Sequence, residues 1–117
     1  MVTDGPRLNL VVVRGEDPGR LVQFYEAVGL RFIMEKHGGG PKHYAAVIGE
    51  IVFEIYPVRS ATDNTSGIRL GFKVDSVRGV IEGLRDQGLL NVHGHDHSAG
   101  RAILKDPAGH VVELAER

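Results

Sequence analysis

The apolar and polar residues of the first half of the chain alternate in short runs around one helical stripe. Residues 8–14 alternate with the period of a β-strand, so that successive side chains point to opposite faces. Asp17 and Pro18 then begin a stripe with apolar residues at i, i+3, i+4 and i+7, which predicts a helix that ends at Gly29. Further strands are predicted at residues 30–36, 44–48 and 51–57.

The second half has the same order of elements. A strand is predicted at residues 68–75, followed by a helix that Asp75 or Ser76 caps and that ends at Gly88. The remaining strands are predicted at residues 89–93, 101–105 and 111–114. A turn with Pro107 and Gly109 leads into the last of them, because proline presets its φ angle and glycine accepts a positive one.

The two halves are also related residue by residue. Adding 59 to a position in the first half gives a matching residue in the second, as in the pairs Leu21 and Val80, Gly29 and Gly88, and Glu54 and Glu113. An internal repeat of this kind decides the architecture. We therefore predict an α+β fold in a single domain, residues 1–117, with two βαβββ modules at about residues 7–58 and 68–116. A polar linker at about residues 59–67 joins them.

Each predicted module has one helix, which covers only one face of its strands. In the last strand of the first module, alternation places Phe53 and Ile55 toward the helix and Glu54 on the free face. Glu113 takes the same place in the second module, and Arg69 shares its free face. Two free faces set together form a cupped mixed sheet around a pocket, with the helices on the outer face. Glu54 and Glu113 are therefore candidate pocket carboxylates, the alternative being a solvated outer face.

Composition excludes several classes of function. The 117 residues, 42% of them apolar, suffice for one domain with a substantial core. A net charge of −1 gives no preference for nucleic acid or for an anionic membrane. The lack of cysteine excludes disulfides, thiolate nucleophiles and cysteine metal sites. No apolar run approaches the ~20 residues that cross a bilayer, and residues 1–7 lack the apolar core of a signal peptide, so we expect a cytoplasmic protein.

Three segments together resemble the vicinal oxygen chelate superfamily, which includes glyoxalase I, bleomycin-resistance proteins and extradiol dioxygenases. They are residues 24–32 (FYEAVGLRF), 52–56 (VFEIY) and 106–114 (DPAGHVVEL). The likeness extends over about residues 8–116, and the segments occur in order in a duplicated chain of this length. It implies two βαβββ modules that build a cupped sheet, and a homodimer. Where members of the family hold a metal, side chains on the first and last strands of the modules bind it.

The resemblance carries over only part of that metal site. Glu113 and Glu54 match the last-strand carboxylates of the family. The first-strand position, usually histidine, falls at Leu10 by the 59-residue offset or at Asn9 by strand alternation, and neither is a good ligand. Its equivalent in the second module is Arg69, whose guanidinium is always charged and has no lone pair to donate. We therefore expect no metal here and an ion pair of Arg69 with one of the two carboxylates. The alternative is a divalent metal (Zn, Ni, Mn or Fe) bound through both carboxylates.

Two further residues are candidates for contact with a bound molecule. Tyr56 has an amphipathic ring that suits a pocket wall. His43, with His37, flanks a glycine-rich turn, which is either a lid that brings a histidine to the pocket or an ordinary hairpin. The histidines within residues 93–97 lack the framework of a zinc site, and His110 in the last turn is expected to be exposed.

Two classes of function follow from these observations. The first, favoured by the missing first-strand ligands, is a metal-free protein whose pocket binds a small molecule. The residues expected to contact that molecule are Asn9, Arg69, Tyr56 and His43. The second is a metal-dependent lyase, isomerase or dioxygenase acting on a small oxygenated substrate, with Glu113 or Glu54 as general base. For Arg69, a structural salt bridge and an anion-binding role both stay open, and likeness of fold is weak evidence for any one chemistry.

Overall fold

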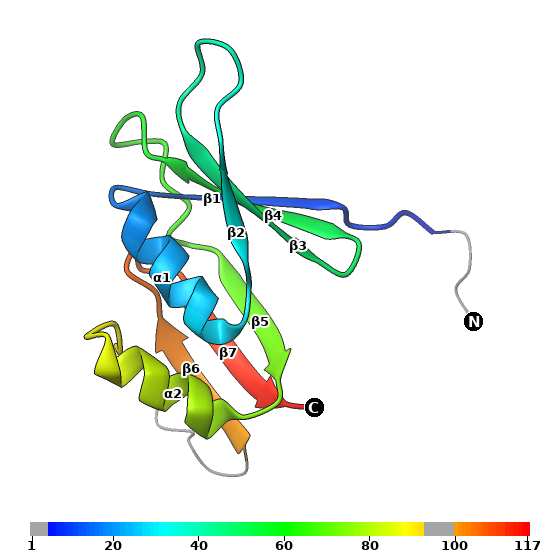
Figure 1. Ribbon diagram of the computed structural model, residues 1–117, viewed down its shortest axis with the longest axis vertical. Helices are drawn as coiled ribbons and strands as arrows, with labels where there is room; N and C mark the ends of the chain where they lie inside the picture. Colours follow the sequence, from blue (N-terminus) through cyan, green and yellow to red (C-terminus); the bar gives the residue numbers. More distant parts are fainter. Residues whose placement is uncertain (1–4, 93–99) are drawn as a thin grey trace.

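The computed structural model describes residues 5–92 and 100–117, which form an α+β fold with two helices and seven strands in these ranges (Figure 1). In chain order the elements are β1 (Leu10–Gly15), α1 (Pro18–Val28), β2 (Phe32–Glu35), β3 (His43–Ile48), β4 (Ile51–Pro57), β5 (Arg69–Val74), α2 (Val77–Asp86), β6 (Arg101–Lys105) and β7 (Val111–Glu116). The predicted α+β class, with one helix after the first strand of each half, is confirmed.

The strands form two separate mixed sheets. Sheet A has the order β1-β4-β3-β2 and sheet B the order β5-β7-β6. In sheet A, β1 runs parallel to β4, and in sheet B, β5 runs parallel to β7. The register of the two parallel pairs reproduces the repeat seen in the sequence: Leu10 lies opposite Val52 in sheet A, and Arg69 lies opposite Val111 in sheet B. Both members of the second pair follow those of the first by 59 positions, so the structure shows the same duplication.

Local signals set the ends of both helices. The Asp17 side chain accepts a hydrogen bond of 3.2 Å from the backbone N–H of Arg20, and Pro18 occupies the first turn, where its missing N–H leaves no bond unmade. Gly29 ends α1 with a φ of 130°, in the region that favours glycine. Ser76, rather than Asp75, caps α2 by accepting a hydrogen bond of 2.9 Å from the next turn of the helix.

One hydrophobic core joins the two modules. The helices lie on the same side of their sheets, and α1 contacts α2 (Figure 1). Aromatic rings cross between the modules: Phe72 of β5 lies 5.8 Å from Tyr25 of α1 and 6.2 Å from Phe53 of β4, measured between ring centroids. The buried residues facing this core include Leu21, Phe24, Ile55, Leu84, Leu104, Val112 and Leu114.

A buried polar network ties the last turn to the first module. Oδ2 of Asp106 accepts hydrogen bonds from Tyr25 Oη at 2.5 Å and from His110 Nδ1 at 2.7 Å, while Oδ1 accepts from two backbone N–H groups of the turn. Nε2 of His110 lies 2.6 Å from Oγ1 of Thr65 in the linker. Burial and the Asp106 carboxylate both raise the pKa of Tyr25, so its hydroxyl stays protonated.

The prediction that His110 is exposed is therefore wrong. Its side chain is fully buried, because the hydrogen bonds to Asp106 and Thr65 satisfy both ring nitrogens and offset the cost of removing them from water.

The strand predicted at residues 89–93 is also a correction within the described chain. Only Val92 pairs there, as an isolated bridge to Leu104, together with a hydrogen bond from the Lys105 N–H to the Asn91 carbonyl. Leu89, which lies just after the end of α2, instead buries its side chain in the hydrophobic core. The His-rich segment at residues 93–97 lies outside the described residues. Neither helix of the described ranges is long and apolar enough to span a membrane.

Candidate functional site

The free face of sheet A carries Glu54, as predicted from alternation. Its neighbours Phe53 and Ile55 are buried against the helices, whereas the Glu54 side chain, 18% exposed, points to the opposite side. In the sheet, Glu54 lies between Val12 of β1 and Ala45 of β3. The carboxylate therefore stands on a floor of short apolar side chains, partly shielded from water.

His43 and Tyr56 stand beside Glu54 on the same face. The two rings are stacked, with centroids 4.2 Å apart and planes 6° from parallel. Nε2 of His43 lies 3.9 Å from Oε2 of Glu54. On the other side of Tyr56, in β1, the guanidinium of Arg14 lies 5.1 Å from the ring centroid, a cation–π contact. A row of a guanidinium, a phenol and an imidazole thus borders the carboxylate.

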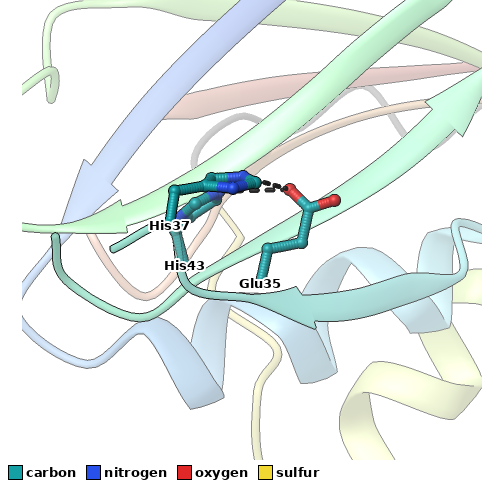
Figure 2. Close-up of side chains that lie close together, drawn as sticks. All are labelled: Glu35, His37 and His43. Atoms are coloured by element: carbon teal, nitrogen blue, oxygen red, sulfur yellow. Dashed lines mark hydrogen bonds and ion pairs between the residues drawn. The ribbon is translucent and has the colours of Figure 1, made fainter. Parts of the chain in front are cut away.

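The β2–β3 hairpin adds two more polar groups to this face. Glu35 lies directly opposite His43 in the ladder, and its Oε1 is 3.1 Å from His43 Nε2. His37, two residues further on, brings its Nε2 to 3.7 Å from the same oxygen. Figure 2 shows both imidazoles converging on the Glu35 carboxylate. His43 is buried, whereas the His37 side chain is 75% exposed, so the cluster opens to solvent on the side of the turn.

The free face of sheet B is built around an ion pair. Nε of Arg69 donates to Oε2 of Glu113, with side chains 60% and 32% exposed respectively. The pairing register places three further cations on this face: Lys73 of β5, and Arg101 and Lys105 of β6. Because Glu113 is the one carboxylate among them, this face is strongly positive, unlike the face with Glu54.

Asn9 lies apart from these groups. It is an exposed residue just before β1, and its carbonyl accepts a hydrogen bond of 2.9 Å from the N–H of Val52. By alternation with Val11 and Val13, its side chain falls on the helix side of sheet A, opposite to Glu54. The register makes Leu10 the counterpart of Arg69, which settles the choice between the two first-strand positions in favour of the strict repeat.

The structure thus assembles two groups on two sheets. Glu54, His43 and Tyr56 lie together in sheet A, and Arg69 pairs with Glu113 in sheet B. A cleft of about 820 Å³ runs between the modules on the helix side, along apolar residues such as Phe53, Leu70 and Phe72, and neither Glu54 nor Glu113 lines it. The carboxylates on the free faces of the two sheets therefore lie outside this cleft.

Sequence reasoning missed Arg14 and Glu35 as members of the site. Arg14 could have been found from the alternation of β1, since it shares a face with Val12. Glu35 required the hairpin register: a turn of seven residues between it and His43 makes the two direct partners. The groups that could bind a metal therefore include a carboxylate on β2, Glu35, in addition to the one on β4.

The chain belongs to the Glyoxalase/Bleomycin resistance protein/Dioxygenase superfamily, whose family model matches residues 7–114. This agrees with the resemblance to the vicinal oxygen chelate superfamily drawn from the three sequence segments. Members of this superfamily commonly use divalent metals. No curated protein sequence matches the chain at a significant level.

Solved structures share the fold at low sequence identity. TnmS3, an antibiotic-binding protein from Streptomyces sp. CB03234, is 18% identical with a TM-score of 0.70, over 98% of this chain and 98% of its own. The trypanothione-dependent glyoxalase I of Leishmania major is 21% identical with a TM-score of 0.69, over 96% and 87%. The fosfomycin resistance protein FosX from Mesorhizobium loti is 18% identical with a TM-score of 0.67, over 97% and 92%.

The residues at the expected family metal position do not fit a metal ion. Leu10 has no donor atom, and Arg69 holds a permanent positive charge against Glu113. A cation there would have to displace the guanidinium from its carboxylate and then lie beside it. No chemical step is therefore derived through a metal at Glu113.

Proposed function

We propose that this protein binds a small molecule on the free faces of its sheets, without a metal at the family position. The observation that carries the proposal is the ion pair between Arg69 and Glu113, which replaces a histidine and its metal by a guanidinium and its carboxylate. Such a site is polar and can orient a ligand, because a guanidinium offers several N–H donors in a fixed plane. It lacks the Lewis acid on which metal-dependent lyase or dioxygenase chemistry at Glu113 would depend.

The chemistry of the two faces suggests the class of ligand. Sheet B presents four cationic side chains around one carboxylate, which favours an acidic group such as a carboxylate or phosphonate. Sheet A presents Glu54, which accepts a hydrogen bond from a hydroxyl or amine, beside the partly exposed Tyr56. The faces of the Tyr56 ring are covered by His43 and Arg14, so an aromatic ring of a ligand would meet its edge. A ligand with a planar ring and an acidic group satisfies both.

A homodimer would close the two open faces into one pocket, and we include it in the proposal. On the free face of sheet A, Glu35 and Glu54 outnumber the one arginine, Arg14, whereas sheet B carries four cations and one carboxylate, so the faces of two chains are complementary in charge. The free face of sheet A also has exposed apolar residues beside the carboxylates, namely Leu10, Ile33 and Val47. Exposed apolar side chains rimmed by polar ones mark association surfaces.

The experiment is a thermal-shift and calorimetric screen of small aromatic acids and antibiotics, with a chelator present throughout. The proposal expects a saturable ligand whose binding is weakened at least about tenfold in both Glu54→Gln and Arg69→Leu, since each loses a charged hydrogen bond of about 1.5–3 kcal/mol. Arg59→Leu, which removes an exposed ion pair with Asp63 in the linker, is the matched control and should bind as the wild type does. Analytical ultracentrifugation of the same samples tests the dimer.

One observation favours an enzyme as the second candidate. Glu54 is a shielded carboxylate 3.9 Å from an imidazole, an arrangement that suits a general base beside a proton acceptor. Nuclear magnetic resonance of the bound ligand over time separates the two functions. Turnover that stops in Glu54→Gln while binding persists would favour the enzyme, and an unchanged ligand would favour binding alone.

A further inference from the structure

We propose that Glu35, His37 and His43 form a binding site for one divalent first-row transition-metal ion at the β2–β3 turn. These ligands are separate from Glu113 and from the first strands, so the proposal does not rest on the proposed function. The three side chains each offer a ligand atom, and these atoms all lie within 4.8 Å of one another. Two histidines and a carboxylate are a ligand set that suits Zn²⁺ and Fe²⁺.

The hairpin builds this cluster from local geometry. Glu35 and His43 face each other at the end of the antiparallel ladder, where directly opposite side chains are close. His37 is brought back over them by the turn, in which Gly40 N–H donates to the His37 carbonyl at 3.0 Å and Gly38 has a φ of 57°. The turn thus sets His37 close to Glu35 and His43 as a third ligand (Figure 2).

The distances are close to those of a coordinated ion. Ligand atoms about 2.1 Å from a tetrahedral Zn²⁺ lie about 3.4 Å from one another. Oε1 of Glu35 lies 3.1 Å from His43 Nε2 and 3.7 Å from His37 Nε2. The His37 side chain is exposed, so neighbouring groups do not confine its approach to an ion. The open side of the cluster leaves a fourth position for water or for Glu54, whose Oε2 is 3.9 Å from His43 Nε2.

His43 itself points to a cation at Nε2. A neutral imidazole has one N–H, yet His43 has an acceptor at each nitrogen: the Pro41 carbonyl is 3.3 Å from Nδ1, and Glu35 is 3.1 Å from Nε2. With the proton on Nδ1, donated to the backbone carbonyl, Nε2 presents a lone pair to two carboxylates. This is the arrangement in which metal-binding histidines are held, and the stack on Tyr56 fixes the ring plane.

The charges around the cluster also favour a cation, because its carboxylates have no lysine or arginine partner among the described residues. Throughout residues 5–92 and 100–117, no lysine or arginine nitrogen comes within 4.0 Å of the carboxylate of Glu35 or Glu54, so their partners are imidazoles alone. The nearby Arg14 is directed elsewhere, since its Nε lies 3.4 Å from Asp63 and its Nη1 donates to the Pro57 carbonyl. Two carboxylates that pair with imidazoles, and with no lysine or arginine of the described ranges, favour a divalent ion.

The test is calorimetric titration of the chelator-treated full chain with Zn²⁺, and with Co²⁺ followed by its visible d–d absorption. We expect one ion per chain, and a loss of affinity of about 100-fold or more in His37→Ala and in Glu35→Gln. His37 is exposed and Glu35→Gln keeps the shape of the side chain, so both variants should fold as the wild type does, which their melting temperatures check.

Three controls locate the ion. Glu50→Gln removes an exposed carboxylate of the next turn, and its binding should be unchanged. Replacing the histidines of segment 93–97 by alanine should also leave binding unchanged. Glu113→Gln should do the same. The proposal is overturned if the chain binds no Zn²⁺ or Co²⁺, if His37→Ala and Glu35→Gln bind as tightly as the wild type, or if a control variant abolishes binding. Loss of binding in Glu113→Gln would contradict the proposed function as well, because it would place the ion at the family position.

Discussion

Tyr25→Phe removes one hydroxyl from the buried network that joins α1 to the turn after β6. In the wild type, this hydroxyl donates to Oδ2 of Asp106 at 2.5 Å, with both side chains buried. The substitution keeps the ring, and with it the contacts to Phe24, Phe53 and Phe72. Stability therefore changes through the hydrogen bond and very little through packing.

The magnitude follows from the charge of the acceptor. A hydrogen bond to an ionised group contributes about 1.5–3 kcal/mol to the free energy of unfolding. Asp106 retains its three other donors in the variant, so the loss is that of one bond. For a chain of this size, we expect the melting temperature to fall by roughly 6–12 °C.

The pH dependence gives a second, independent signature. Because the pKa of Tyr25 is raised in the folded protein, the unfolded chain loses this proton above about pH 10 while the folded chain keeps it. The contribution of Tyr25 is therefore fully present below about pH 10 and is lost as the pH rises further, by about 1.4 kcal/mol per pH unit. The difference in stability between wild type and Tyr25→Phe should shrink between pH 9 and pH 11.

Urea denaturation at several pH values, followed by circular dichroism, measures both effects. Tyr44→Phe is the matched control, because Tyr44 is half-buried and its hydroxyl makes no hydrogen bond to another described residue. We expect this control to lie within about 0.5 kcal/mol of the wild type. A Tyr25→Phe variant as stable as the wild type at pH 7, or a difference that stays constant up to pH 11, would refute the reasoning.

Four further predictions concern packing, helix propensity and the ion pair. Gly15→Ala places a Cβ 2.5 Å from Cδ1 of the buried Leu21 and should cost about 1–3 kcal/mol by denaturation, whereas Gly83→Ala, with open space in α2, should stabilise by about 0.5–1 kcal/mol. Leu84→Ala leaves a cavity in the core and should cost about 2–5 kcal/mol in the same assay. Glu113→Gln breaks an exposed ion pair and should cost no more than about 1 kcal/mol, so a larger loss would show that the pair is structural.

The elements that local sequence determines could be predicted closely. β4 and β6 have the predicted bounds, and α1 begins at Pro18 and stops before Gly29 as its capping residues indicate. The alternation that assigned Glu54 to the free face needed only a period of two, which the strand imposes wherever it pairs.

The features that were predicted wrongly or missed depend on contacts between residues distant in the sequence. His110 is buried because Tyr25 and Thr65, far away in the sequence, complete its network, and no local pattern around the turn indicates this. The segment after α2 has the residues of a strand, yet Leu89 is drawn into the core and only Val92 pairs. The cluster around Glu35 required the hairpin register, which a glycine-rich turn does not specify uniquely.

The most direct test of the central claim is whether a ligand binds without metal and whether its binding depends on Arg69 and Glu54. We would screen small aromatic acids and antibiotics by thermal shift in the presence of a chelator, and compare wild type with Arg69→Leu and Glu54→Gln. The account predicts a ligand that stabilises the wild type without metal and stabilises both variants much less. Stabilisation that appears only with added metal and disappears in Glu113→Gln would contradict it.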